Sequence, residues 1–101
     1  MSFPGRTPPT EVEAAHILAL RVVEFLSRES DHLQVFLGST GLSADDLRGR
    51  LQDPEVLAAA MDFLMLEDRW VLAFAADAGI DPRVIPDLRR HLPGGGSPHW
   101  T

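Results

Sequence analysis

Apolar residues recur at intervals of three and four along most of this chain, and no stretch shows the strict alternation of a half-buried β-strand. The first such segment begins after Thr10, which forms a capping box with Glu13, each side chain accepting a hydrogen bond from the other residue's backbone N–H. We therefore expect a first helix from Glu11 to Arg28. The apolar stripe expected to face the core comprises Val12, Ala15, Leu18, Ala19, Val22, Phe25 and Leu26.

Start and stop signals mark three further helices in the middle of the chain. Ser30 is expected to cap the second, which ends in the glycine-rich stretch 38–41. Ser43 opens a short third helix, and Asp53 followed by Pro54 opens a fourth, because proline at the first helical position loses no hydrogen bond. The fourth is apolar on nearly all sides and is therefore expected at the centre. The expected core positions are Leu33, Phe36, Leu37, Leu47, Leu51, Leu57, Met61 and Leu64.

The signals that begin and end helices are weaker in the last third of the chain. Neither proline nor glycine separates the fourth helix from the apolar segment 70–78, which ends at Gly79. Asp81 followed by Pro82 signals one more N-cap and helix start. A second proline, Pro86, would clash with the carbonyl four residues back, so we expect a separate first turn and then a helix from about Pro86.

A shift of 38 residues superimposes the first part of this pattern on the second, so that caps, core aromatics and terminating glycines coincide. The matched pairs are Glu24/Asp62, Phe25/Phe63, Leu26/Leu64, Glu29/Glu67, Ser30/Asp68, Leu33/Val71, Phe36/Phe74, Gly41/Gly79, Leu42/Ile80 and Ser43/Asp81. Either the chain is a duplicated three-helix unit with pseudo-twofold symmetry, or two ordinary helix–turn–helix segments share caps and core spacing. In both cases the register predicts a helix start at Asp68, and hence six helices.

The predicted fold is all-α: a compact irregular or orthogonal bundle of about six helices, in two related three-helix halves if the repeat is a true duplication. A chain of 101 residues has room for one such domain, which we assign to residues 10–92. The proline-rich residues 1–9 and the glycine-rich residues 93–101 are predicted as a disordered lead and a flexible tail. The phenylalanines expected to meet in the core are Phe25, Phe36, Phe63 and Phe74.

Composition narrows the classes of function. The net charge is −6, which opposes the phosphate contacts on which most nucleic-acid binding depends. The chain has no cysteine, so disulfides, thiolate metal sites and a cysteine nucleophile are excluded. No window is long and apolar enough for a membrane span, and residues 1–6 lack the layout of a secretory signal, so we expect a cytoplasmic protein.

No constellation of catalytic or metal-binding residues stands out. No two histidines are three or four residues apart, the spacing of metal pairs on a helix; they are His16, His32, His91 and His99. The acidic pairs Asp45-Asp46 and Glu67-Asp68 fall at helix starts, where a carboxylate is expected to cap the helix. We therefore predict no catalytic residue, metal or cofactor and a protein that is not an enzyme. An enzyme with a pocket between helices is kept as a third hypothesis.

Apolar residues on otherwise polar stripes are the strongest indication of function. Ile17 and Leu20 intrude on the charged stripe of the first helix, and Met65 and Leu66 lie at the end of the fourth. Such residues are covered either by another helix of the chain or by a partner. The leading hypothesis is a small protein-interaction or scaffold module, whose partner is an unknown protein or a second copy of the chain.

A basic patch supports a second hypothesis. The last predicted helix carries Arg83, Arg89, Arg90 and His91, with Asp87 as its only acidic residue. These cations would form the binding surface of a regulatory nucleic-acid-binding protein. The alternative explanation is that cations near a helix C-terminus complement the helix dipole.

Four short strings of core and turn residues carry a resemblance to a known family. They are residues 36–42 (Phe-Leu-Gly-Ser-Thr-Gly-Leu), 46–48 (Asp-Leu-Arg), 61–64 (Met-Asp-Phe-Leu) and 72–75 (Leu-Ala-Phe-Ala). In this order they resemble a family of short alphaproteobacterial proteins catalogued as domain of unknown function 3572, from about Ala15 to Leu92. The resemblance implies a bacterial protein and supplies no catalytic residues.

Overall fold

Six α-helices joined by short turns make up residues 10–94 of the computed structural model, which is the part of the chain that the structure describes. The helices are α1 (Glu11–Ser27), α2 (Ser30–Thr40), α3 (Ala44–Gly49), α4 (Pro54–Leu64), α5 (Asp68–Ala78) and α6 (Val84–Arg89). The all-α prediction and the predicted number of helices are confirmed. The predicted lead, and the predicted tail from residue 95 onward, lie outside the described residues.

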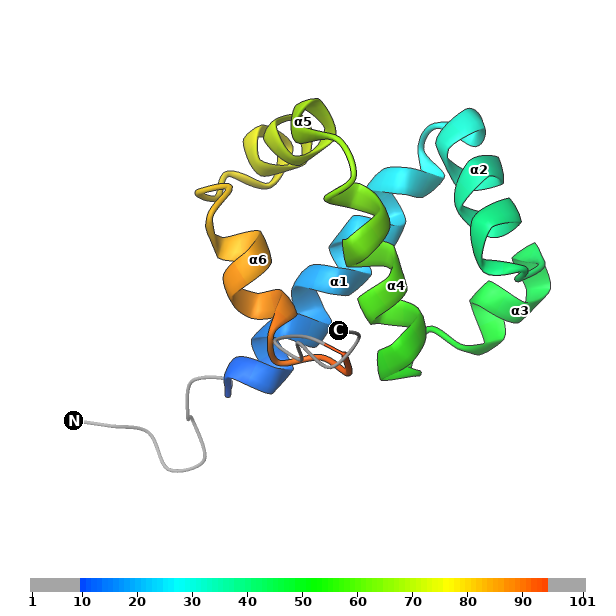
Figure 1. The fold of residues 1–101 in the computed structure, drawn as a ribbon, viewed down its shortest axis with the longest axis horizontal. Helices are drawn as coiled ribbons and strands as arrows, with labels where there is room; N and C mark the ends of the chain where they lie inside the picture. The colour runs from blue at the N-terminus through cyan, green and yellow to red at the C-terminus, as the bar shows by residue number, and fades with distance from the viewer. Residues whose placement is uncertain (1–9, 95–101) are drawn as a thin grey trace, which may run out of the picture.

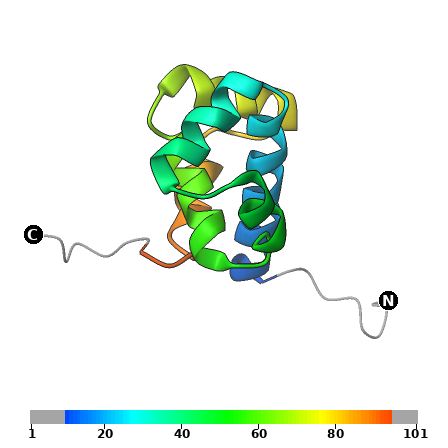
Figure 2. The same ribbon diagram turned by 90° about the vertical axis from the view of Figure 1, so that its right-hand side faces the viewer.

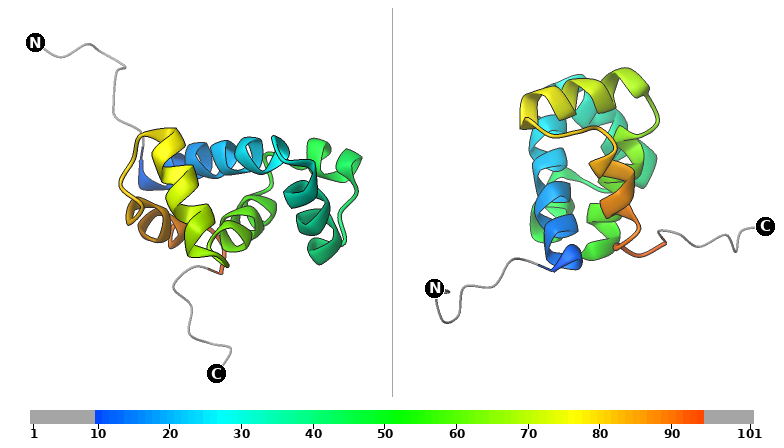
Figure 3. Two further views of the ribbon diagram at one scale, coloured as in Figure 1. Left: turned by 90° about the horizontal axis from the view of Figure 1, so that it is seen from above. Right: turned by 90° about the vertical axis from the view of Figure 1, so that its left-hand side faces the viewer.

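The centre of the bundle is the contact between α1 and α4, which pack side by side (Figure 1). Helices α2 and α3 flank this pair on one side (Figure 2), and α5 and α6 flank it on the other (Figure 3). Helix α4 is enclosed on most of its faces, as its sequence predicted. Its buried residues are Val56, Leu57, Ala58, Ala60, Met61, Phe63 and Leu64.

The predicted break between the fourth and fifth helices is confirmed. Helix α4 ends at Leu64, and α5 begins at Asp68 after a short turn. The expectation that Ser30 caps the second helix is wrong, because Ser30 is already the first helical residue. Glu29 is the N-cap of α2, as Glu67 is of α5, and both adopt an extended backbone without a side-chain capping bond.

The 38-residue repeat extends to the hydrophobic core. Helices α2 and α5 coincide from end to end under the shift, and each ends at a glycine in the left-handed region, with φ of 78° at Gly41 and 70° at Gly79. Buried residues of the first half fall on buried residues of the second. These pairs are Leu18/Val56, Ala19/Leu57, Val22/Ala60, Val23/Met61, Leu26/Leu64, Phe36/Phe74, Leu37/Ala75 and Leu47/Ile85.

The four predicted core phenylalanines form two edge-to-face pairs, and each pair joins the two halves. Phe25 meets Phe74 with ring centroids 5.4 Å apart and an interplanar angle of 77°, and Phe36 meets Phe63 at 5.4 Å and 64°. The shift carries Phe25 to Phe63 and Phe36 to Phe74, so it exchanges the two pairs. The aromatic contacts are therefore related by a pseudo-twofold exchange, and each half supplies rings to the core of the other. The helix contacts are less symmetric, because α1 packs closely on α2 and α6 whereas the equivalent pairs, α4 with α5 and α4 with α3, make weaker contacts.

One contact lies on the pseudo-twofold axis itself. His32 in α2 and Trp70 in α5 are equivalent under the shift, and their rings lie 5.0 Å apart. Trp70 also stacks on Phe63, at 5.3 Å with an interplanar angle of 28°. The starts of α2 and α5 are thus held together by aromatic packing.

Three details differ from the predictions: the burial of Val12, the first residue of α6, and the N-cap of α6. Val12, expected in the core, is 48% exposed, because it lies in the first turn of α1, where no described element covers its side chain.

The separate turn before the last helix is confirmed, but α6 begins at Val84, ahead of Pro86. Pro86 is then the third helical residue, where a missing N–H costs no intrahelical bond. Asp81 is not the N-cap of α6, although it accepts a hydrogen bond from the backbone N–H of Arg83 at 2.9 Å.

The glycines at the ends of α2 and α5 give a stability prediction. Gly41→Ala and Gly79→Ala should each lower the free energy of unfolding by about 1 kcal/mol, because an L side chain is strained at these φ angles. Gly38 is the matched control: it lies inside α2 with open space around it, so Gly38→Ala should raise stability by up to about 1 kcal/mol. Urea denaturation measures all three variants. Equal effects at Gly38 and Gly41 would contradict the assigned cap.

Candidate functional site: an apolar groove between α5 and α6

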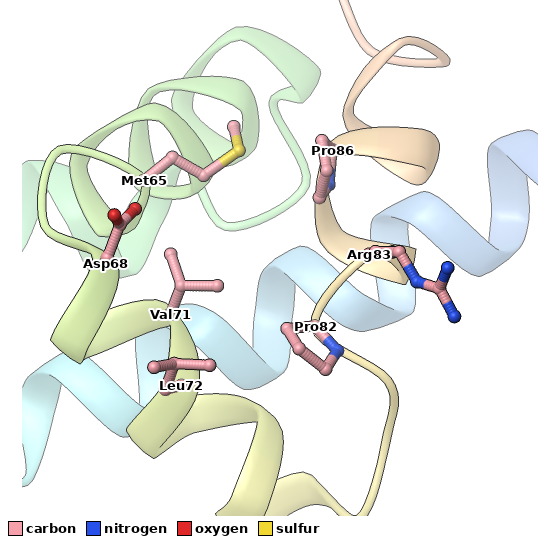
Figure 4. Close-up of a pocket in the computed structure, with 7 residues that line it drawn as sticks. All are labelled: Met65, Asp68, Val71, Leu72, Pro82, Arg83 and Pro86. Carbon is pink, nitrogen blue, oxygen red and sulfur yellow. The ribbon is translucent and has the colours of Figure 1, made fainter.

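A groove of about 460 Å³ runs between α5 and α6 (Figure 4). Met65, Val71 and Leu72 form one wall, and Pro82 and Pro86 form the other. The groove arises because α5 and α6 are joined by a turn that holds them apart, and because both prolines present flat apolar rings to it. Its surface suits aliphatic or aromatic side chains.

The charged groups at the groove differ in how they are matched. Asp68 lies at its edge and makes no ion pair with any described residue, whereas the guanidinium of Arg83 points away from Val71 (Figure 4). Arg83 is held by Asp81, with Nε–Oδ1 3.2 Å and Nη2–Oδ2 2.9 Å. The side-chain hydrogen bonds from Arg83, followed by its backbone N–H, lower the pKa of Asp81 to about 2. Asp68 is therefore the one unmatched charge among the groove's described lining residues.

The four residues predicted as a partner surface are not all available. Leu66 is 72% exposed and Ile17 is 50% exposed, so both present apolar surface to solvent. Leu20 and Met65 are half-buried and pack against the core, which corrects their assignment as surface residues. Met65 nevertheless lines the groove, so one of the four contributes to it.

Leu72 is a prominent apolar surface residue that sequence reasoning missed. It is 58% exposed and lies on the lip of the groove. Nothing in the periodicity of α5 distinguishes it from a core position. The repeat does, since the equivalent residue in α2 is the polar Gln34.

Arg89, predicted to belong to a basic patch, is a packing residue. Its side chain is only 12% exposed, and it binds both carboxylate oxygens of Asp62 in α4, with Nε–Oδ1 2.7 Å and Nη2–Oδ2 2.9 Å. It also donates to the backbone carbonyl of Leu92 at 3.2 Å. Arg89 therefore ties the last helix to the centre of the bundle.

The other predicted basic residues are also largely matched. Arg83 is engaged by Asp81, and Nε2 of His91 lies 3.4 Å from Oε1 of Glu11 at the start of α1. Arg90 contacts only the backbone carbonyl of Asp87, at 3.5 Å. Three of the four residues thus face a carboxylate, and the last helix does not present a concentrated positive charge.

Of the two acidic pairs, Asp45-Asp46 contributes a side-chain cap to a helix start, whereas Glu67 is an N-cap without a side-chain capping bond. Asp46 completes a capping box with Ser43, which the sequence predicted, and Asp45 pairs with Arg48. Glu67 lies 3.7 Å from Arg69. Between residues 10 and 94 no three histidine or carboxylate side chains gather in a manner that could hold a metal ion. No helix in the same part of the chain has the length and apolar character needed to cross a membrane.

A second hollow, of about 320 Å³, lies between α1 and α5 and is polar. Arg28 crosses it, with Nη1 2.9 Å from Oδ2 of Asp77 and Nη2 3.9 Å from Oε1 of Glu24. These side chains satisfy one another. The hollow therefore offers an enzyme hypothesis no unmatched acid–base pair.

Residues 12–95 match the family model described as "Protein of unknown function (DUF3572)". The chain belongs to this family. The match spans all six helices, so the DUF3572 region coincides with the described bundle. No curated protein and no solved structure matches the chain. Because the DUF3572 description names no activity, a functional hypothesis depends on the groove and the surfaces beside it.

Arg89 and Arg90 separate the structural from the nucleic-acid explanation of the last helix. Arg89→Ala should lower the free energy of unfolding by about 1 kcal/mol, because it removes the exposed bidentate contact to Asp62 and the partly buried hydrogen bond to Leu92. Arg90→Ala, the neighbouring exposed control, should change it by less than about 0.5 kcal/mol. Thermal and urea unfolding give both values. Unchanged stability of Arg89→Ala would remove its packing role.

The pairing of Asp81 with Arg83 predicts a pH dependence. Because folding lowers the pKa of Asp81 from 3.8 to about 2, its contribution to stability is present above about pH 4 and is lost as the pH falls towards 2. Asp81→Asn removes this contribution. The difference in unfolding midpoint between wild type and Asp81→Asn should therefore shrink over that interval, and a constant difference would contradict the pairing.

Proposed function

We propose that this protein is a non-enzymatic protein-interaction module that binds its partner through the apolar surface of its second half. We call this the α5 surface; it comprises Leu66, Leu72, Ala73 and Ala76 together with the groove beside Leu72. All four named residues are exposed. We also propose that the protein is cytoplasmic and bacterial and that it uses no cofactor, as expected from the sequence.

The comparison between the two halves carries this proposal. Both halves have the same order of helices and share buried positions, so the first half indicates which surface residues the fold requires. At positions equivalent to the α5 surface and its groove, the first half has mainly polar residues. The pairs are Ser27/Met65, Arg28/Leu66, Gln34/Leu72 and Arg48/Pro86. At these four positions folding therefore does not demand an apolar residue, which supports contact with a partner as their use. Ala73 is an exception, because its equivalent Val35 is also apolar and is 59% exposed.

The energetics agree with a binding role. Burial of a leucine side chain contributes about 1.5–3 kcal/mol, so covering Leu66 and Leu72 supplies a useful part of a binding free energy. Leaving both exposed forgoes that contribution and adds a risk of aggregation. Exposed apolar groups beside a concave apolar groove are typical of a protein-binding site.

The nucleic-acid hypothesis has less support. Three of the four candidate cations are matched by carboxylates, and the net charge of the chain is −6. A retardation assay at low salt with Arg90→Glu tests the remaining cation. Binding that this variant abolishes would restore the hypothesis.

Site-specific photo-cross-linking in the producing cell tests the proposed function. A photoreactive residue at Leu72 should give a discrete protein adduct, identified by mass spectrometry, because the α5 surface is covered by a partner. The same residue at Gln34, the equivalent position in α2, should give little or none. Circular dichroism confirms that both variants fold. Equal labelling at the two positions, or none at Leu72, would overturn the proposal.

A further inference from the structure

We propose that the partner of the α5 surface is a second copy of this chain, bound so that the two α5 helices lie antiparallel across a twofold axis. This inference rests on the proposed function and names its partner. It comes from the order of apolar, small and charged residues along the exposed side of α5.

The exposed side of α5 forms a seam for another helix. Arg69, Ala73 and Ala76 follow a four-three spacing, which places them along one side of α5, and all three are exposed. Leu66, also exposed, lies in the turn just before the helix. The small Ala73 and Ala76 allow a neighbouring backbone to approach closely, since the distance between packed helices depends on the side chains between them. The seam is thus apolar at its middle, with Leu72 beside it at the lip of the groove.

The charges of the seam are self-complementary. Arg69 lies four residues before Ala73, and Asp77 lies four residues after it. If Ala73 sits on a twofold axis and the helices are antiparallel, Arg69 of each copy faces Asp77 of the other. A parallel arrangement would oppose like charges. An antiparallel pair also aligns the helix dipoles favourably.

Both charged residues are accessible for such a contact. Nε of Arg69 is 3.7 Å from Oε1 of Glu67, a loose and exposed pair. Asp77 accepts from Arg28 through Oδ2, and no described residue donates to its Oδ1. Arg69 can therefore keep its contact with Glu67, and Asp77 its contact with Arg28, while each forms an additional ion pair with a second copy.

Helix α2 shows that this arrangement belongs to the second half alone. The shift places Asp31 at the position of Arg69 and Ser39 at that of Asp77, so α2 lacks opposed charges at the two ends. Its centre also differs, with Val35 and Gly38 in place of the two alanines. The charge pattern that suits a second copy is therefore confined to α5.

Charge exchange between Arg69 and Asp77 tests the antiparallel dimer. Wild type is expected to dimerise with a dissociation constant on the order of micromolar, because an 11-residue helix offers a small contact. Arg69→Asp and Asp77→Arg each place like charges opposite one another in their own dimers, which should weaken dimerisation about tenfold. A mixture of the two variants restores both oppositely charged contacts and should dimerise about as tightly as wild type. Sedimentation equilibrium measures all four samples.

Controls separate this effect from damage to the fold. Leu72→Asp should abolish the dimer, whereas Gln34→Asp, its equivalent in α2, should not. Arg28→Ala removes the present neighbour of Asp77 and should leave the dimer intact. Circular dichroism reports whether each variant is folded.

The possible outcomes distinguish this inference from the proposed function. A mixture that associates no more tightly than its components, or a wild type that is monomeric at several hundred micromolar, overturns the second copy as partner. If Leu72 then cross-links to a different protein, the interaction module survives with another partner. If Leu72 gives no adduct, both proposals fall.

Discussion

The burial of α1 against α4 is the contact on which the rest of this structure depends. Both helices carry apolar stripes, and a three-helix half of roughly 40 residues lies at the size below which a chain rarely folds alone without staples. The flanking helices are fixed by what they share across this interface: Phe74 of α5 packs on Phe25 of α1, and Phe36 of α2 packs on Phe63 of α4. Each half thus supplies the ring that closes the core of the other, so the two halves are expected to fold cooperatively.

Comparison of the two halves also separates the residues that folding requires from those that it does not. Residues that agree between the halves, such as the buried pairs Leu26/Leu64 and Leu47/Ile85, are those that build the core. Residues that differ while the backbone stays the same are free to serve another purpose. Leu72, where the first half has Gln34, belongs to this second group. The comparison of the two halves therefore marks Leu72 as a candidate binding residue more clearly than its exposure alone does.

Local hydrogen bonding made much of the fold predictable from sequence. The capping boxes at Thr10 and Ser43 join residues three apart, and the break before Asp68 follows from the repeat. Tertiary contacts were not predictable. Arg89 and Asp62 are 27 positions apart in the sequence and meet only because α6 packs on α4, so an expected cationic patch includes a packing contact. The candidate site was likewise predicted only in part. Leu66 was identified from the sequence, but Leu72 was not, because the packing of α5 in the bundle decides which of its sides faces solvent.

The difference between the exposed sides of α2 and α5 has a consequence for assembly. A chain with one self-complementary surface forms a closed dimer, whereas a chain with two such surfaces continues to add copies and grows into an open assembly. Duplication of a three-helix unit would have produced two equivalent outer helices, and hence two potential surfaces. The first half has Arg28 and Gln34 where the second has Leu66 and Leu72, so α2 exposes Val35 without the two leucines that accompany α5. If α5 binds a second copy as proposed, the divergence of the halves limits association to two copies, while the core shared by the two halves keeps the shape that presents α5.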